Sequence, residues 1–134
     1  MDSLIVPEAG CPLCPGNGKV DIMSDRGIAY LVVPKISPVD DCYLIVPTQH
    51  ITDIRSLPDT WQVAVSYLMN DVPWFVPGES AYNLSLNVGK AAGQTLPHLH
   101  FWVIPRTANE EVPSYGLGAA TLVQQIDSKV DVNT

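Results

Sequence analysis

The sequence has few basic residues and an excess of acidic ones. Seven Lys and Arg stand against 14 Asp and Glu in 134 residues, which gives a formal net charge of −7. We therefore expect no nucleic-acid partner, because Lys and Arg neutralise most of the phosphates in such complexes. Any phosphate site in this chain has to be local and has to draw mainly on backbone amides and a histidine.

Long apolar runs are also lacking. No stretch reaches the length needed to span a bilayer, and residues 1–7 do not form a basic, apolar leader with a small-residue cleavage site. We therefore predict a soluble cytoplasmic protein with no membrane partner. The length of 134 residues and the 46% hydrophobic content are typical of one domain, here residues 1–134.

Cysteine is scarce and odd in number, with three residues in all. An odd count does not suggest a disulfide framework, whereas Cys11 and Cys14 have the C-x-x-C spacing of a metal knuckle. The residues alone leave three interpretations open for this pair: a structural zinc site, two reduced thiols in a loop, or a redox pair. His50 and His98 are available to complete a tetrahedral set of four ligands.

Two of the three histidines, His98 and His100, lie two residues apart in a run of apolar and aromatic residues that is typical of a strand. Side chains alternate across a strand, so we expect both imidazoles and Trp102 to share one face. The preceding segment, residues 89–95, is rich in glycine and small residues and can bring backbone N–H groups close to a phosphate. The sequence therefore predicts phosphate donors and a nucleophile at one site.

Periodicity predicts the remaining elements. Residues 28–33 and 43–46 are rich in β-branched and aromatic residues and should pair as antiparallel strands, and residues 82–88 alternate as a third strand. Residues 58–72 carry apolar positions at helical spacing, including Trp61, which we assign to the core. A short helix is expected over 119–130.

Cys42 is interpreted as a buried apolar residue. The role of Trp74 and Phe75 stays open between core edge, dimer contact and nucleobase wall.

The composite of Asn87, Gly93-Gln94-Thr95, His98-x-His100 and Pro105-Arg106 resembles the signature of the histidine triad (HIT) superfamily of nucleotidyl hydrolases and transferases. The resemblance implies an α+β fold, with an antiparallel sheet of about five strands and one long helix. It also implies a nucleotide or nucleotide-conjugate substrate and a homodimer.

Zinc-bearing members of the superfamily, including the galactose-1-phosphate uridylyltransferase branch, combine a C-x-x-C, a distant histidine and the first histidine of H-x-H. The resemblance thus implies a structural Zn²⁺ ion, with residues 1–20 as a knuckle-like segment. The matching positions in this sequence are Cys11, Cys14, His50 and His98.

In the family pattern the second histidine attacks the α-phosphate, which makes His100 the catalytic nucleophile that forms a covalent nucleotidyl-histidine. The resemblance assigns nucleotide and phosphate binding to Asn87, Gly93, Gln94, Thr95 and Trp102. Trp102 is a departure, because hydrolases of the family carry a third histidine there and the uridylyltransferase branch carries Gln. An indole donates one N–H and has no titratable proton. A nucleotide-binding module or regulator with little catalysis is the alternative function.

Overall fold

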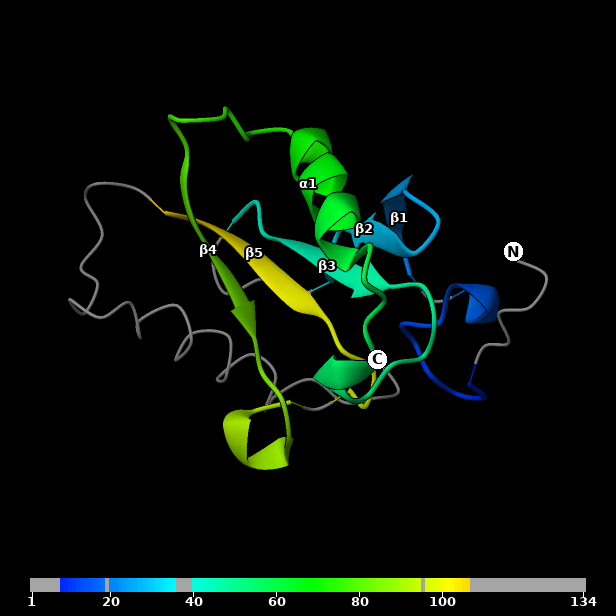
Figure 1. Cartoon of the computed structure of the whole chain (residues 1–134). Helices are drawn as coiled ribbons and strands as arrows, with labels where there is room; N and C mark the ends of the chain where they lie inside the picture. The colour runs from blue at the N-terminus through cyan, green and yellow to red at the C-terminus, as the bar shows by residue number, and fades with distance from the viewer. Residues whose placement is uncertain (1–7, 19, 36–39, 95, 107–134) are drawn as a thin grey trace.

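A computed structural model of the chain describes residues 8–18, 20–35, 40–94 and 96–106. Five strands and one α-helix make up its regular structure (Figure 1). In chain order they are β1 (Ile22–Asp25), β2 (Ala29–Val32), β3 (Tyr43–Pro47), α1 (Trp61–Asp71), β4 (Ala81–Leu86) and β5 (Phe101–Arg106). The described residues also form three short 3-10 turns: η2 (Pro15–Asn17) before β1, η3 (Ile54–Ser56) before α1 and η4 (Lys90–Ala92) before β5.

The strands form one antiparallel sheet in the order β1-β2-β3-β5-β4. The first three strands follow one another as a meander, and β5 then inserts between β3 and β4. The connection from β3 to β4 carries α1, which lies across one face of the sheet (Figure 1). The arrangement confirms the predicted α+β fold with its five-stranded antiparallel sheet and single long helix.

The helix packs on the face of the sheet formed by alternate residues of β2, β3 and β5. Leu31, Ile45 and Val103 are fully buried on this face, and Leu68 of α1 is fully buried against them. Trp61 begins the helix and is 9% exposed, so its assignment to the core is confirmed. The helix lies mainly over β1 and β2 and reaches β5 through the Trp61–Phe101 ring contact, so Tyr82 and Leu84 of β4 stay exposed among the described residues.

The opposite face of the sheet is covered by the N-terminal segment. Leu13 packs there on Tyr30, Leu44, Val46 and Trp102, and the Tyr30 hydroxyl donates a hydrogen bond to the Leu13 carbonyl. Burial raises the pKa of the Tyr30 hydroxyl, which stays protonated and keeps this bond at any working pH. The histidine motif lies on this second face.

Two details differ from the predicted strands. The paired histidines precede β5, which begins at Phe101, because the Leu99 N–H donates to the Ile51 carbonyl at 2.8 Å instead of joining the ladder. The sequence of β1 shows no alternation of apolar and polar residues that would predict a strand. β1 is an edge strand, and its residues are largely exposed. Cys42 is 2% exposed, which confirms its assignment to the interior.

The predicted helix over 119–130 lies outside the described residues. In the part of the chain that the structure describes, no helix combines the length and the apolar character needed to cross a membrane.

Candidate metal centre and histidine site

The N-terminal knuckle is built by local hydrogen bonds around the two cysteines. The Cys14 N–H donates to the Cys11 carbonyl at 3.3 Å, and the Asn17 amide group donates to the same carbonyl at 2.8 Å. Gly18 closes the turn with φ of 68°, a left-handed conformation that glycine adopts at little cost. The loop thus turns both sulfurs inward, where Cys11 is 4% and Cys14 1% exposed.

His50 and His98 come from segments 48 residues apart in sequence but lie beside each other. His50 follows the end of β3, and the bond between the Leu99 N–H and the Ile51 carbonyl holds the two segments together. Their ring centroids are 5.1 Å apart and the ring planes are nearly perpendicular, at 86°. Perpendicular rings allow one nitrogen from each to point at a common centre.

The four predicted ligand atoms converge. The Sγ atoms of both cysteines and the Nδ1 atoms of both histidines lie within 4.8 Å of one another. The Cys14 sulfur is 3.4 Å from Nδ1 of His50 and 3.6 Å from Nδ1 of His98, and the Cys11 sulfur is 3.5 Å from the same His98 atom. A tetrahedral ion with bonds of about 2.3 Å to sulfur and 2.0 Å to nitrogen separates S from N by about 3.5 Å. The set therefore fits a tetrahedral metal ion.

Protonation states around the site also suit a cation. The Nε2–H of His98 donates to the Pro47 carbonyl at 2.7 Å, which leaves Nδ1 as the lone-pair nitrogen facing the sulfurs. Burial lowers the pKa of His98 to about 4, so this imidazole is neutral. Burial also raises the pKa of Cys14 to about 11, because a buried thiolate needs a compensating positive charge. A bound cation supplies that charge.

His100 is held two residues further on, and it is 3% exposed. Its Nδ1–H donates to the His98 carbonyl at 3.0 Å. The contact engages Nδ1, so Nε2 is the ring nitrogen that does not take part in this bond. An imidazole nitrogen can act as a nucleophile toward phosphorus.

Trp102 lies on the same side of the sheet as the two histidines. Its ring centroid is 6.5 Å from that of His100, with the planes at 65°. The side chain is 3% exposed, and its Nε1 has no hydrogen-bond partner among the described residues. Across the ladder Trp102 pairs with Leu44 of β3 and Ser85 of β4. An unpartnered buried donor is costly, and it is satisfied when an acceptor atom binds beside it.

The loop that precedes the histidines is braced by Gln94. Its Oε1 accepts from the Gly89 N–H at 2.8 Å, and its Nε2 donates to the Leu96 carbonyl at 2.7 Å. Gly93 has φ of 99°, in the region that favours glycine, and is buried. The carboxamide therefore shapes the turn from within. Thr95 lies outside the described residues.

Asn87 is 8% exposed and follows β4 at the start of this loop. The sequence did not predict two backbone groups that hold this site, the carbonyls of Pro47 and Ile51. Backbone carbonyls leave no residue-type signal, so no pattern could have found them. Ser85 lies opposite Trp102 through the register of β4 on β5.

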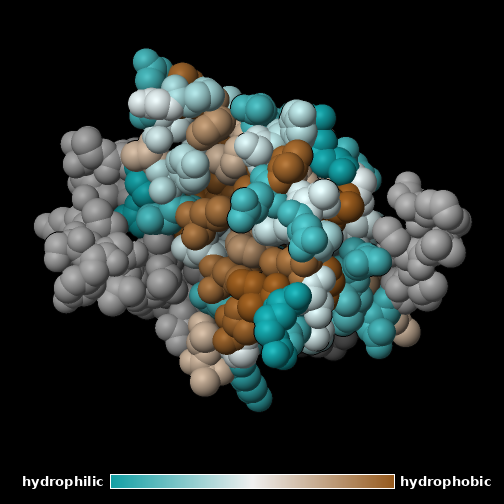
Figure 2. All heavy atoms as spheres, viewed as in Figure 1, coloured by the Kyte–Doolittle hydropathy of each residue, from teal (hydrophilic) through white to brown (hydrophobic). Residues whose placement is uncertain are grey.

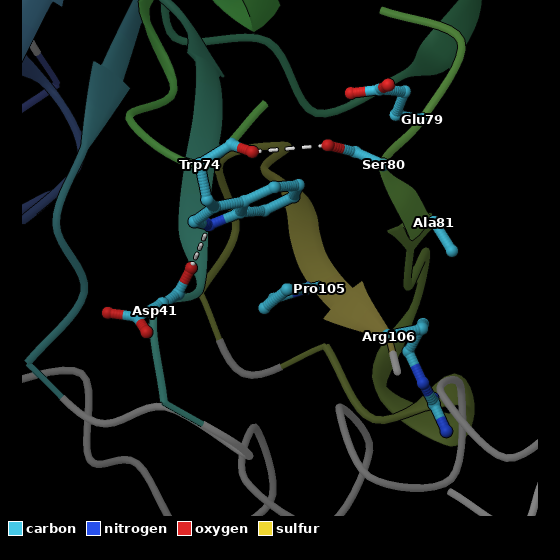
Figure 3. A pocket seen from close by; sticks show the side chains of 7 residues that line it. All are labelled: Asp41, Trp74, Glu79, Ser80, Ala81, Pro105 and Arg106. Carbon is cyan, nitrogen blue, oxygen red and sulfur yellow. Dashed lines mark hydrogen bonds between the residues drawn. The ribbon is translucent and has the colours of Figure 1, made fainter. Parts of the chain in front are cut away.

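A separate hollow lies at the far end of β5. It has a volume of about 440 Å³ and is lined by Trp74, Pro105 and Arg106 among others. The Trp74 Nε1–H donates to the Asp41 carbonyl at 2.7 Å, and the indole lies over Pro105 (Figure 3). Arg106 is six residues beyond His100, about 20 Å along an extended chain. This hollow is therefore not part of the histidine site.

Comparisons with known proteins agree with this geometry. A family model described as "HIT domain" matches residues 26–109, which is more than half of the chain. A protein of Helicobacter pylori named "Uncharacterized HIT-like protein" is 36% identical over 62 residues, which cover 46% of this chain and 60% of the relative. An adenosine 5′-monophosphoramidase of Schizosaccharomyces pombe is 35% identical over 75 residues, covering 56% and 53% respectively. The chain thus spans between half and two thirds of the length of these relatives.

The solved structure of a Zn-bound histidine triad family protein from Mycobacterium smegmatis superposes with a TM-score of 0.60. It is 20% identical, and the match covers 88% of this chain and 96% of that one. At that identity the likeness shows the fold alone.

Proposed function

This chain belongs to the HIT domain family, and from that premise we propose that it is a nucleotide hydrolase or nucleotidyltransferase acting on an α-phosphate. The reaction passes through a covalent nucleotidyl-histidine on His100. The observation that carries the proposal is the 3.0 Å hydrogen bond from His100 Nδ1–H to the His98 carbonyl, because it orients the ring and makes Nε2 the nitrogen that attacks phosphorus. The name of the fission-yeast relative, a monophosphoramidase, supports the same class of chemistry.

In the first step the Nε2 lone pair forms a bond to the α-phosphorus while the bond from phosphorus to the leaving group breaks. The leaving group takes that electron pair. In the second step water or an acceptor hydroxyl attacks phosphorus, the P–N bond breaks, and its electrons return to Nε2. The attacking oxygen gives its proton to solvent, and the imidazole is regenerated.

Charge on the phosphate oxygens needs donors. We assign these to the loop that begins at Asn87 and includes Gly93, Gln94 and Thr95, with the Trp102 N–H as a further donor. The Gln94 carboxamide bonds to its own loop, and its contribution is therefore to orient backbone N–H groups. Each such donor typically lowers the barrier by about 3 kcal/mol, a factor of about a hundred in rate.

We propose that Cys11, Cys14, His50 and His98 hold a structural zinc ion. A zinc ion bound there supplies rigidity and charge compensation, because four protein ligands leave no coordination position open for water. His98 is both a ligand and the residue whose carbonyl orients His100. The metal centre therefore positions the nucleophile through one residue.

We propose that the chain forms a homodimer through the apolar face of the sheet that α1 leaves uncovered. Tyr82 and Leu84 of β4 and Val88 just beyond it alternate along the chain and are 38%, 45% and 47% exposed. Figure 2 shows hydrophobic atoms gathered over β4 on this side of the molecule. Among the described strands β4 is also at the edge of the sheet, which suits pairing with a second copy. Leu84→Asp should halve the mass measured by light scattering, whereas Met23→Asp on β1, at the other edge, should leave it unchanged.

We propose a cytoplasmic location because Cys11, Cys14 and Cys42 form no disulfide in the structure. Cysteines without disulfides are typical of a reducing compartment. No nucleic-acid partner is proposed, because the net charge of −7 repels phosphate polyanions.

The test is intact-mass spectrometry after rapid mixing with a dinucleoside polyphosphate. A labile nucleotidyl adduct that peptide mapping assigns to His100 is expected. His100→Asn is the matched variant, because its amide keeps a donor for the His98 carbonyl and lacks the nucleophile. It should fold normally and give neither adduct nor turnover. Wild-type turnover that survives in His100→Asn would contradict the proposal.

The alternative is a nucleotide-binding module with little catalysis, which the untitratable indole of Trp102 and the 3% exposure of His100 favour. Calorimetry separates the two. Tight nucleotide binding without turnover, equal in the wild type and in His100→Asn, supports the module.

A further inference from the structure

The proposed zinc ligands come in two halves that the fold brings together. The thiols of Cys11 and Cys14 belong to the N-terminal knuckle, and the imidazoles of His50 and His98 lie beside the end of β3. A tetrahedral ion requires its sulfur and nitrogen ligands at fixed separations. The affinity for the ion therefore depends on how firmly each half is held relative to the other.

The imidazole half is held by the backbone of β3. The Nε2–H of His98 donates to the carbonyl of Pro47, the last residue of β3, at 2.7 Å. Pro47 pairs with Ala29 of β2 in the antiparallel ladder. The next pair of that ladder joins Val46 to Tyr30. The ladder therefore places Tyr30 beside the residues that hold His98.

The thiol half is shaped by bonds within its own turn. The Cys14 N–H and the Asn17 amide group both donate to the Cys11 carbonyl. These bonds set the shape of the turn, but they do not fix its distance from the sheet. The Tyr30 hydroxyl supplies a link of that kind, because it donates from β2 to the carbonyl of Leu13. Leu13 lies between the two cysteines in the sequence.

The Tyr30 side chain is suited to hold this carbonyl in place. It is fully buried, and it belongs to the same packed cluster as Leu13 and both cysteine side chains. The packing holds the phenol ring, so its hydroxyl keeps one position relative to the ladder. The Leu13 carbonyl in turn gains the hydrogen-bond partner that a buried polar group needs.

We infer that Tyr30 is a positioning residue of the proposed zinc centre, and that it raises the zinc affinity by holding the knuckle at its distance from His98. The inference rests on the zinc site proposed above and adds to it a residue that is not a ligand. Loss of such a supporting hydrogen bond typically lowers metal affinity by about 10–100-fold. Because the His98 carbonyl accepts from His100, a loosely held centre also positions the nucleophile less well.

The experiment measures the zinc affinity of the full chain by competition with a chromophoric chelator. Tyr30→Phe removes only the hydroxyl group, and its zinc association constant should fall by about 10–100-fold. Tyr43→Phe is the matched control, because Tyr43 is also a buried tyrosine of the sheet but packs in the cluster on the α1 face. The zinc affinity of this variant should equal that of the wild type.

A second measurement separates positioning from general stability. Each protein is unfolded with denaturant in its zinc-loaded and zinc-free forms, and the difference between the two stabilities reports zinc binding to the folded chain. A hydroxyl that stabilised only the fold would lower both stabilities alike. We expect the difference to shrink in Tyr30→Phe and to stay unchanged in Tyr43→Phe. If zinc-free Tyr30→Phe does not fold, the rate of zinc release from its loaded form to excess chelator decides, and it should exceed the wild-type rate.

The outcomes separate this inference from the zinc proposal beneath it. Zinc affinity or release of Tyr30→Phe equal to that of the wild type, or an equal loss of affinity in both tyrosine variants, overturns the role of Tyr30. Either result leaves the zinc site and the chemistry of His100 standing. A wild-type chain that binds no zinc overturns both the zinc site and the role of Tyr30.

Discussion

Removing the metal from Cys11, Cys14, His50 and His98 should lower the melting temperature of the protein by about 15 °C. The proposed zinc ion would tie Cys11 to His98 across 87 residues. If the link is treated as a cross-link that restricts the unfolded chain, a loop of that length corresponds to about 4.6 kcal/mol. An unfolding entropy of about 2.1 cal/mol/K per residue, taken over 134 residues, converts this free energy into about 16 °C.

The assay is differential scanning calorimetry before and after dialysis against a strong chelator, with zinc measured by elemental analysis. One zinc per chain is expected before dialysis. Cys14→Ser should abolish the chelator-induced shift, because three ligands bind the ion weakly. Cys42→Ser is the control, since this thiol is also buried but belongs to no metal set. Its shift should equal that of the wild type.

Two results would refute the reasoning. A shift below about 3 °C would mean that the ion contributes less than about 1 kcal/mol to stability. An equal loss of the shift in Cys14→Ser and Cys42→Ser would show that burial of a thiol, and not coordination, is what the chelator experiment detects.

Three other outcomes are expected. Leu68→Ala should destabilise the protein by about 2–5 kcal/mol in denaturant titration, because Leu68 is fully buried between α1 and the sheet. The Ser24 hydroxyl and then Arg26 hold the pKa of Asp71 below its usual value, so this stabilisation is present above about pH 4 and is lost as pH falls through the folded pKa. Asp71→Asn should cost about 1 kcal/mol at pH 7 and nothing near pH 2, measured by urea midpoints. Gln94→Glu should raise proteolysis within residues 89–96 and weaken nucleotide binding about tenfold, because it loses the donor to the Leu96 carbonyl.

Each has a control. Val63 on α1 is 56% exposed, so Val63→Ala should change stability by less than about 0.5 kcal/mol. Ser24→Ala should reduce the pH-dependent part of the stability that Asp71 contributes. An unchanged contribution would contradict the role assigned to the Ser24 hydroxyl. Nucleotide binding by Gln94→Glu as tight as that of the wild type would contradict the role of Gln94 in shaping the loop.

Most of the architecture could be predicted from local patterns. β2 and β3 follow from their β-branched and aromatic composition, because every residue in them is buried. β4 and α1 follow from alternation and from helical periodicity respectively. β1 could not be predicted in this way. It is an edge strand with largely exposed residues, so no face of it requires apolar side chains at alternate positions. The histidine motif was assigned to the strand, yet β5 begins at Phe101, because a backbone bond from Leu99 to a distant loop replaces the ladder there.

The sequence by itself determined which residue types were available: two thiols at knuckle spacing, two alternate imidazoles, and an indole where a third imidazole is usual. Only the tertiary structure decided that the thiols and imidazoles converge within 4.8 Å, that the His98 carbonyl selects the tautomer of His100, and that Ser85 lies opposite Trp102. The physical reason is that spacing along the chain controls local geometry alone. Contacts between segments 36 to 87 residues apart depend on strand order, register and backbone carbonyls, which no residue pattern specifies.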